Sequence, residues 1–199
     1  VLTDYLEAHP ESRYCNRVQA LIAASYFSEE KYMETIATLK GCDISLLSDE
    51  ERDASALRMG TSYLKVDKWQ EAAFWFSVLK DSSKAYYPDA VYNLAYIDYV
   101  QQKYDSALQG FREVKDDQKF QKLAPYYIAD IYLIQNNYAQ ARKVADAYLA
   151  LYPEEKNAGQ MSRISGEAAY GQKDYAAAIQ SLERYREGET MPARLAMYK

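Results

Sequence analysis

Glycine, proline, cysteine and histidine are scarce in this sequence, which has 7 Gly, 5 Pro, 2 Cys and 1 His among 199 residues. The shortage of Gly and Pro favours long helices, because both residues destabilise a helix interior. His9 has neither a second His nor a Cys at the spacing of a metal motif, so no metal site is expected. Cys15 and Cys42 would allow one disulfide in an exported protein, but two packed thiols are the preferred interpretation, since free Cys behaves as a small hydrophobe.

Motifs that carry chemistry are also missing. The sequence has no Gly-rich phosphate-binding loop, no GxSxG and no HExxH, so we expect neither an enzyme nor a cofactor. No run of 18 apolar residues exists, which predicts that no segment of this chain spans a membrane. The net charge of −5 argues against a nucleic-acid partner, which requires a basic surface.

Aromatic residues are abundant, and five of them recur with a regular period. The chain has 21 Tyr, and the recurring aromatics are separated by 37, 35, 34 and 37 residues. Each is followed three residues later by a small or short side chain and preceded nine residues earlier by Ala or Gly. The aromatics are Tyr32, Trp69, Tyr104, Tyr138 and Tyr175, and the preceding small residues are Ala23, Gly60, Ala95, Ala129 and Gly166. This is the period of one helix-turn-helix unit stacked on the next.

Each unit is predicted to be a pair of helices, helix A with the small residue and helix B with the aromatic. Apolar residues follow the aromatics at helical spacing, which gives helix B an apolar stripe. A short polar turn joins the two helices. Ser48 and Glu51 have the spacing of a capping box and predict that a helix A begins there, and Pro88, Pro125 and Pro192 are expected in first turns.

The recurring small residue, aromatic, Ala and large apolar residue resemble the tetratricopeptide repeat (TPR) family over nearly the whole chain. The family's Trp near the start of helix A is absent, which is a departure from the pattern. The resemblance implies an all-α fold: a right-handed superhelical solenoid of antiparallel helix pairs. We expect about five full repeats in one array, at residues 11–47, 48–84, 85–119, 120–153 and 154–188.

The two ends look like partial repeats. Residues 1–10 resemble the back half of a helix B, and residues 189–199 resemble the start of a helix A. We therefore expect a fragment of a longer array, with apolar surface exposed at its ends and open there to self-association with another copy.

In the resembling superhelix, helix A lines a concave groove that holds a peptide or a partner protein. Tyr92, Tyr96 and Tyr99 fall on one face of one helix, and Tyr is a common hot-spot residue. The full partner-binding set is Tyr92, Tyr96, Tyr99, Tyr126, Asp130, Leu133, Arg163, Glu167 and Tyr170. Two interpretations stay open: these rings bind a partner, or they only pack the fold. The family's clamp for a C-terminal carboxylate is excluded, because Ala20, Ala24 and Leu57 replace its polar residues.

The sequence thus predicts a protein-interaction scaffold. The segments YLEAHPES and YLALYPEE resemble junctions in repeats of bacterial envelope proteins, which favours a periplasmic or outer-membrane-associated protein over a cytoplasmic one. One alternative is a regulatory or sensory arm of a larger enzyme or signalling protein. Another is a carbohydrate binder that stacks sugars on Tyr rings.

Overall fold

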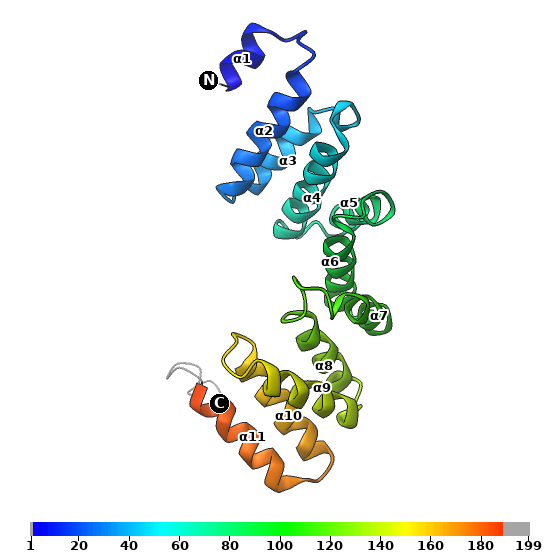
Figure 1. Ribbon diagram of the computed structural model, residues 1–199, viewed down its shortest axis with the longest axis vertical. Coiled ribbons are helices and arrows are strands. Elements are labelled where there is room, and N and C mark those ends of the chain that lie inside the picture. Colours follow the sequence, from blue (N-terminus) through cyan, green and yellow to red (C-terminus); the bar gives the residue numbers. More distant parts are fainter. Residues whose placement is uncertain (1, 189–199) are drawn as a thin grey trace. The chain divides into compact units, whose positions relative to one another are not determined.

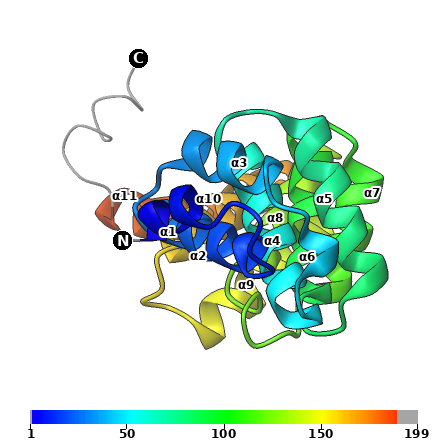
Figure 2. The same ribbon diagram turned by 90° about the horizontal axis from the view of Figure 1, so that it is seen from above.

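The computed structural model describes residues 2–188 and contains helices and loops, with no strand in this range (Figure 1, Figure 2). A short first helix is followed by successive helix pairs. In chain order the helices are α1 (Leu2–Ala8), α2 (Cys15–Ser28), α3 (Tyr32–Lys40), the 3-10 turn η1 (Ile44–Leu46), α4 (Asp49–Lys65), α5 (Trp69–Ser82), α6 (Tyr87–Val100), α7 (Tyr104–Val114), α8 (Ala124–Ile134), α9 (Tyr138–Leu151), α10 (Ala158–Gly171) and α11 (Tyr175–Gly188).

Two compact units make up the chain, one ending at Ile97 and the other beginning at Asp98, so that the last turn of α6 belongs to the second unit. The expected partial repeat at 189–199, with Pro192, lies outside the described residues. None of the helices described is both long enough and apolar enough to cross a membrane.

All five hairpins are closed by the same backbone turn. Three residues separate helix A from helix B in every pair, and helix B begins at the recurring aromatic. The middle turn residue always has a left-handed conformation with φ between 58° and 66°, although none is Gly: Glu30, Asp67, Gln102, Asn136 and Lys173. The next N–H donates to a carbonyl five residues earlier, as from Lys68 to Tyr63 and from Asn137 to Tyr132. This bond belongs to the Schellman motif, which satisfies the free carbonyls at a helix end.

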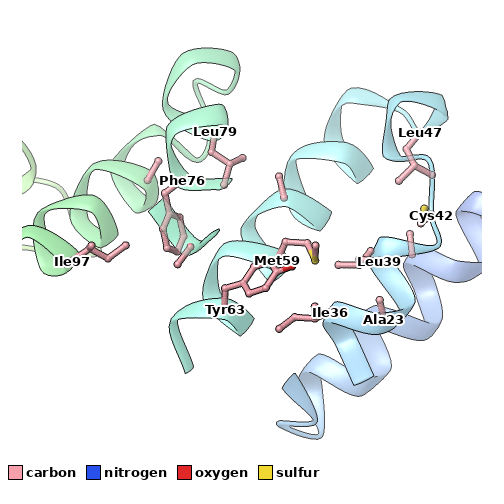
Figure 3. Packing of buried hydrophobic residues seen from close by; sticks show 14 residues of the cluster. Ala23, Ile36, Leu39, Cys42, Leu47, Met59, Tyr63, Phe76, Leu79 and Ile97 are labelled. Atoms are coloured by element: carbon pink, nitrogen blue, oxygen red, sulfur yellow. The ribbon is translucent and has the colours of Figure 1, made fainter. Parts of the chain in front are cut away.

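The core of the first unit lies between α2, α3, α4, α5 and α6. Figure 3 shows Ile36 and Leu39 of α3 directed toward Met59 and Tyr63 of α4, and each of these four side chains is at most 5% exposed. Phe76 of α5 is fully buried against α4. A Cβ at Gly60 would lie 2.8 Å from the Phe76 ring, so this ring occupies the space that the missing side chain leaves.

The second unit repeats this arrangement. Ala129 is fully buried, and a Cβ at Gly166 would lie 2.7 Å from Leu182 of the following helix. The ring of Tyr138 on α9 packs over Gly171 at the end of α10, and a Cβ at Gly171 would lie 2.7 Å from this ring. Among the recurring small residues, Gly60 and Gly166 thus each receive a bulky side chain from the following helix.

Local signals at the helix starts are also confirmed. Ser48 accepts a hydrogen bond from the Glu51 N–H, and the Glu51 carboxylate accepts one from the Ser48 N–H, which completes the capping box of α4. Pro88 and Pro125 lie in the first turns of α6 and α8, where no intrahelical N–H bond is lost.

Both cysteines are free thiols. Cys42 is buried and donates a hydrogen bond to the Asn16 carbonyl, while Cys15 is partly exposed and lies near the carbonyls of His9 and Pro10. Burial, and to a lesser extent Asp43, raises the pKa of the Cys42 thiol. Cys15 and Cys42 are therefore separate thiols in this structure, as the preferred interpretation of the sequence has them.

The apolar stripe of α11 is not buried as its position in the repeat implies. Tyr175 is 56% exposed, Ile179 59% and Leu182 36%. The equivalent residues of the earlier repeats are largely covered; Phe76 and Phe111, for example, are fully buried. Tyr170 of α10 contacts Tyr175, and Gly166 of α10 contacts Leu182, but most of Tyr175 and Ile179 is exposed, so this stripe presents apolar surface.

Candidate partner-binding face

Asp130 of α8 connects three helices of the second unit. The Tyr99 hydroxyl, from the last turn of α6, donates to Asp130 Oδ2 at 2.6 Å. The Arg163 Nη2 group of α10 lies 3.5 Å from Asp130 Oδ1. Asp130 is only 8% exposed, and a carboxylate at this depth needs such donors, because burial removes its water. Within the second unit, Asp130 thus connects the last turn of α6 to α10.

Arg163 is held by further acceptors on its own helix. Its Nη1 donates to Glu167 at 2.8 Å and its Nε donates to Gln160 Oε1 at 3.0 Å. Burial lowers the pKa of Arg163. The hydrogen bond and charge of Glu167, together with the charge of Asp130, raise this pKa by more than burial lowers it, so the net shift is upward. We call Tyr99, Asp130, Gln160, Arg163 and Glu167 the Asp130 cluster. Its two carboxylates and one guanidinium leave a net negative charge.

Aromatic rings pack beside the cluster. The Tyr99 ring makes edge contacts with Tyr104 and Tyr127, at centroid distances of 6.2 and 5.1 Å. The Tyr127 ring stacks on Phe111 at 4.7 Å and contacts Tyr126 edge-on at 5.1 Å. Tyr99 therefore contributes to packing within the second unit, and whether it also binds a partner stays a prediction. Burial, then the charge of Asp130, raises the pKa of Tyr126, while nearby Arg163 lowers it.

The structure brings five of the predicted residues together in the second unit: Tyr99, Tyr126, Asp130, Arg163 and Glu167. Tyr170 lies farther along α10 and is 65% exposed, with its ring in edge contact with Tyr175 at 5.7 Å. Leu133 is half-buried on α8.

Tyr92 and Tyr96 are half-buried on α6 within the first unit. The continuity of the Tyr face from these residues to Tyr126 stays a prediction, as does the role of all nine residues in binding.

Tyr127 and Gln160 are absent from the predicted set. Gln160 stands at a groove position of the fifth repeat, so the repeat offsets already pointed to it. Tyr127 follows a groove position directly and faces Phe111 of α7. The Tyr126-Tyr127 pair was the available signal, because two adjacent rings on one helix must point in different directions.

Residues 2–188 hold no group of three His, Cys, Asp or Glu side chains arranged to bind a metal ion.

No protein-family model and no curated protein matches this sequence. Solved structures do match. A crystal structure of MamA protein aligns with a TM-score of 0.71 at 11% identity and covers 87% of this chain and 91% of that one. A MamA AMB-1 structure gives 0.71 at 15% identity over 88% and 99% of the two chains. A MamA RS-1 double mutant gives 0.74 at 15% identity over 87% and 93%. The chain is thus an all-α, TPR-like helical solenoid, as the repeat predicts.

Proposed function

We propose that this protein is an interaction scaffold, not an enzyme, and that it binds a peptide or a partner protein on the A-helix face that carries the Asp130 cluster. The observation that supports this most directly is the cluster itself: the last turn of α6, α8 and α10 are connected, so that Tyr126, Glu167 and Tyr170 lie on a fixed support. A rigid support reduces the entropy lost on binding.

The chemistry of this face favours a partner with a cationic or hydroxyl-bearing segment. The cluster carries net negative charge, and Glu167 is exposed. Tyr170 offers an exposed ring with few rotatable bonds, which is a common source of binding free energy. We propose that Leu133 adds apolar contact in the second unit, and that Tyr92 and Tyr96 of the first unit also contact a partner. The protein's acidity supports a protein partner over nucleic acid.

Site-specific cross-linking tests this proposal. A photoreactive phenylalanine analogue replaces Tyr170 in one variant and Tyr14, which is 46% exposed in the first unit, in a control. We expect one defined adduct in cells of the source organism from position 170 and none from position 14. Replacing Glu167 and Tyr170 together by Ala should weaken binding of the captured partner by about 2 kcal/mol. The same adducts from both positions, or undiminished affinity in the double variant, would refute the proposal.

The five helix pairs are further proposed to form one array of repeats. Each pair lies within one of the predicted repeat ranges, and all five share the same turn. We also propose self-association through the exposed stripe of α11; replacement of Ile179 by Glu should then reduce the mass measured by light scattering at high concentration.

Placement in the bacterial envelope is proposed on the resemblance of the two Pro-containing repeat junctions at Pro10 and Pro153. Fractionation of cells that express the full-length gene product would decide between the envelope and the cytoplasm.

A further inference from the structure

A second candidate site lies in the second unit, between α7, α8 and α9. It is a pocket of about 520 Å³, open to solvent, and its volume is in the range of ligand-binding pockets. Its lining residues are Arg112, Lys115, Asp116, Gln121, Pro125, Ile128, Tyr132, Gln140, Lys143, Val144, Ala147, Tyr148, Leu151 and Tyr152. None of them belongs to the Asp130 cluster or to the predicted groove.

The floor of this pocket is apolar and well supported. Ile128 is 4% exposed, and Tyr148 is 3% exposed with its hydroxyl 3.3 Å from the Lys122 carbonyl. Tyr152 packs against Tyr148 at a centroid distance of 5.2 Å and donates to Gln121 Oε1 at 3.3 Å. Leu151 extends the apolar surface at the edge and is 72% exposed. The floor and one wall are thus fixed before any ligand arrives.

The rim of the pocket is cationic, although the whole chain is acidic. Three cationic side chains line it against one carboxylate, while the chain has a net charge of −5. Asp116 is paired with its neighbour Lys115. Lys143 is exposed and has no ion-pair partner among residues 2–188. Arg112 donates to the Tyr132 hydroxyl and lies over that ring, with no carboxylate partner in the same range.

These cations come from two different helices that line the pocket, since Arg112 belongs to α7 and Lys143 to α9. A ligand that matches both cations and the apolar floor carries an apolar group together with more than one carboxylate. A single small carboxylate would use only one of the two cations. Acidic segments of proteins are commonly recognised by such basic clusters around an apolar pocket.

We propose that this pocket is a second docking site, which binds an acidic peptide segment of a protein partner by one aromatic or aliphatic side chain. The side chain enters between Ile128, Val144 and Tyr148, and flanking Glu or Asp residues pair with Arg112 and Lys143. The scaffold then offers two sites of opposite charge preference on one unit. The proposal does not depend on the partner-binding role of the Asp130 cluster.

The test uses the whole chain and a fluorescent peptide with one Phe flanked by Glu residues, measured by anisotropy. We expect saturable binding that weakens with added salt, because exposed ion pairs are screened. Replacing Lys143 by Glu should weaken binding about tenfold, since one attractive pair becomes repulsive. The matched control is K80E on α5, which changes the net charge equally and should leave affinity unchanged. A peptide with Lys in place of Glu should not bind the wild-type chain.

A second variant tests the pocket without changing charge. Ala147 is exposed and lines the pocket, so A147W should fill it, abolish binding and leave the far-UV spectrum intact. The proposal is overturned if the Glu peptide does not bind, if K143E and K80E behave alike, or if the Lys peptide binds equally well. It is also overturned if K143E instead dissociates a self-associated species of the protein, since the occupant would then be a second copy.

Discussion

At the scale of single residues, the fold depends on side chains that are absent as much as on those that are present. Gly60 and Gly166 leave room for Phe76 and Leu182, and each of these bulky residues follows its recurring aromatic by seven positions. The sequence predicted the small residue of each helix A and the apolar stripe of each helix B, but the contact between these two positions comes from the structure. The sequence could not predict the Asp130 cluster, since a sequence contains no distances between helices.

The first residue-scale prediction concerns Gly60. A Cβ there would lie 2.8 Å from a ring that has no room to move, because Phe76 is fully buried. G60A should therefore destabilise the protein by about 1 to 3 kcal/mol, although Ala is the better helix former. In G159A the new Cβ would meet only Tyr185 at 3.9 Å, so stability should be unchanged or slightly higher. Urea denaturation compares the two; an equal effect would contradict the assigned packing.

A second residue-scale prediction concerns Tyr99. Replacement by Phe should cost about 1 to 3 kcal/mol, because Asp130 loses its closest donor while it stays buried.

The stability should also depend on pH in a defined way. Burial, followed by the hydrogen bond and charge of Asp130, raises the pKa of Tyr99 well above its ordinary value. The folded chain then keeps a proton that the unfolded chain has lost, so this contribution is complete below about pH 10 and declines above it. Unfolding measured between about pH 9 and 11 should show a shallower decline for Y99F than for wild type. Tyr170→Phe, at an exposed ring, is the control and should retain the wild-type slope.

At the scale of elements, helix bounds were the most predictable property. The period places the aromatics, and every helix B begins at one of them. The capping box at Ser48 was readable because both partners lie within one turn of the chain. The left-handed turn residues were not readable, since the usual signal is Gly and the chain uses Glu, Asp, Gln, Asn and Lys there. The hairpin geometry thus overrides the local preference of these residues.

This leads to a prediction at the turns. Gln102 has φ of 61°, which costs a non-Gly residue about 1 to 2 kcal/mol, partly offset in a Gly variant by its freer unfolded state. Q102G should therefore raise stability by about 0.5 to 1 kcal/mol. N136G should gain less, because Asn tolerates the left-handed region better. Chemical denaturation of both variants provides the measurement, and a loss of stability in Q102G would show that its side chain contributes more than the strain costs.

At the scale of the whole molecule, the sequence predicted the TPR-like class but not the pocket between α7, α8 and α9. The class follows from periodicity, which any repeat of helix pairs must show. The pocket arises where one pair differs from the others: Lys143, Ala147 and Leu151 are specific to the fourth repeat. A comparison of repeats reveals what they share and hides such local differences. The candidate partner-binding face was predictable in part, because the repeat positions indicate its residues but not which of them are in contact.

The uniform closing turn has a consequence for how such a chain can change. Main-chain atoms alone make the hydrogen bond that ends each helix A. The turn of each hairpin therefore does not depend on the side chains that the hairpin has elsewhere. Whole hairpins can then be duplicated, deleted or exchanged while the turn within each hairpin keeps its conformation. A new binding site can then arise from substitutions on the surface of a single hairpin, as the pocket residues Lys143, Ala147 and Leu151 of the fourth repeat illustrate.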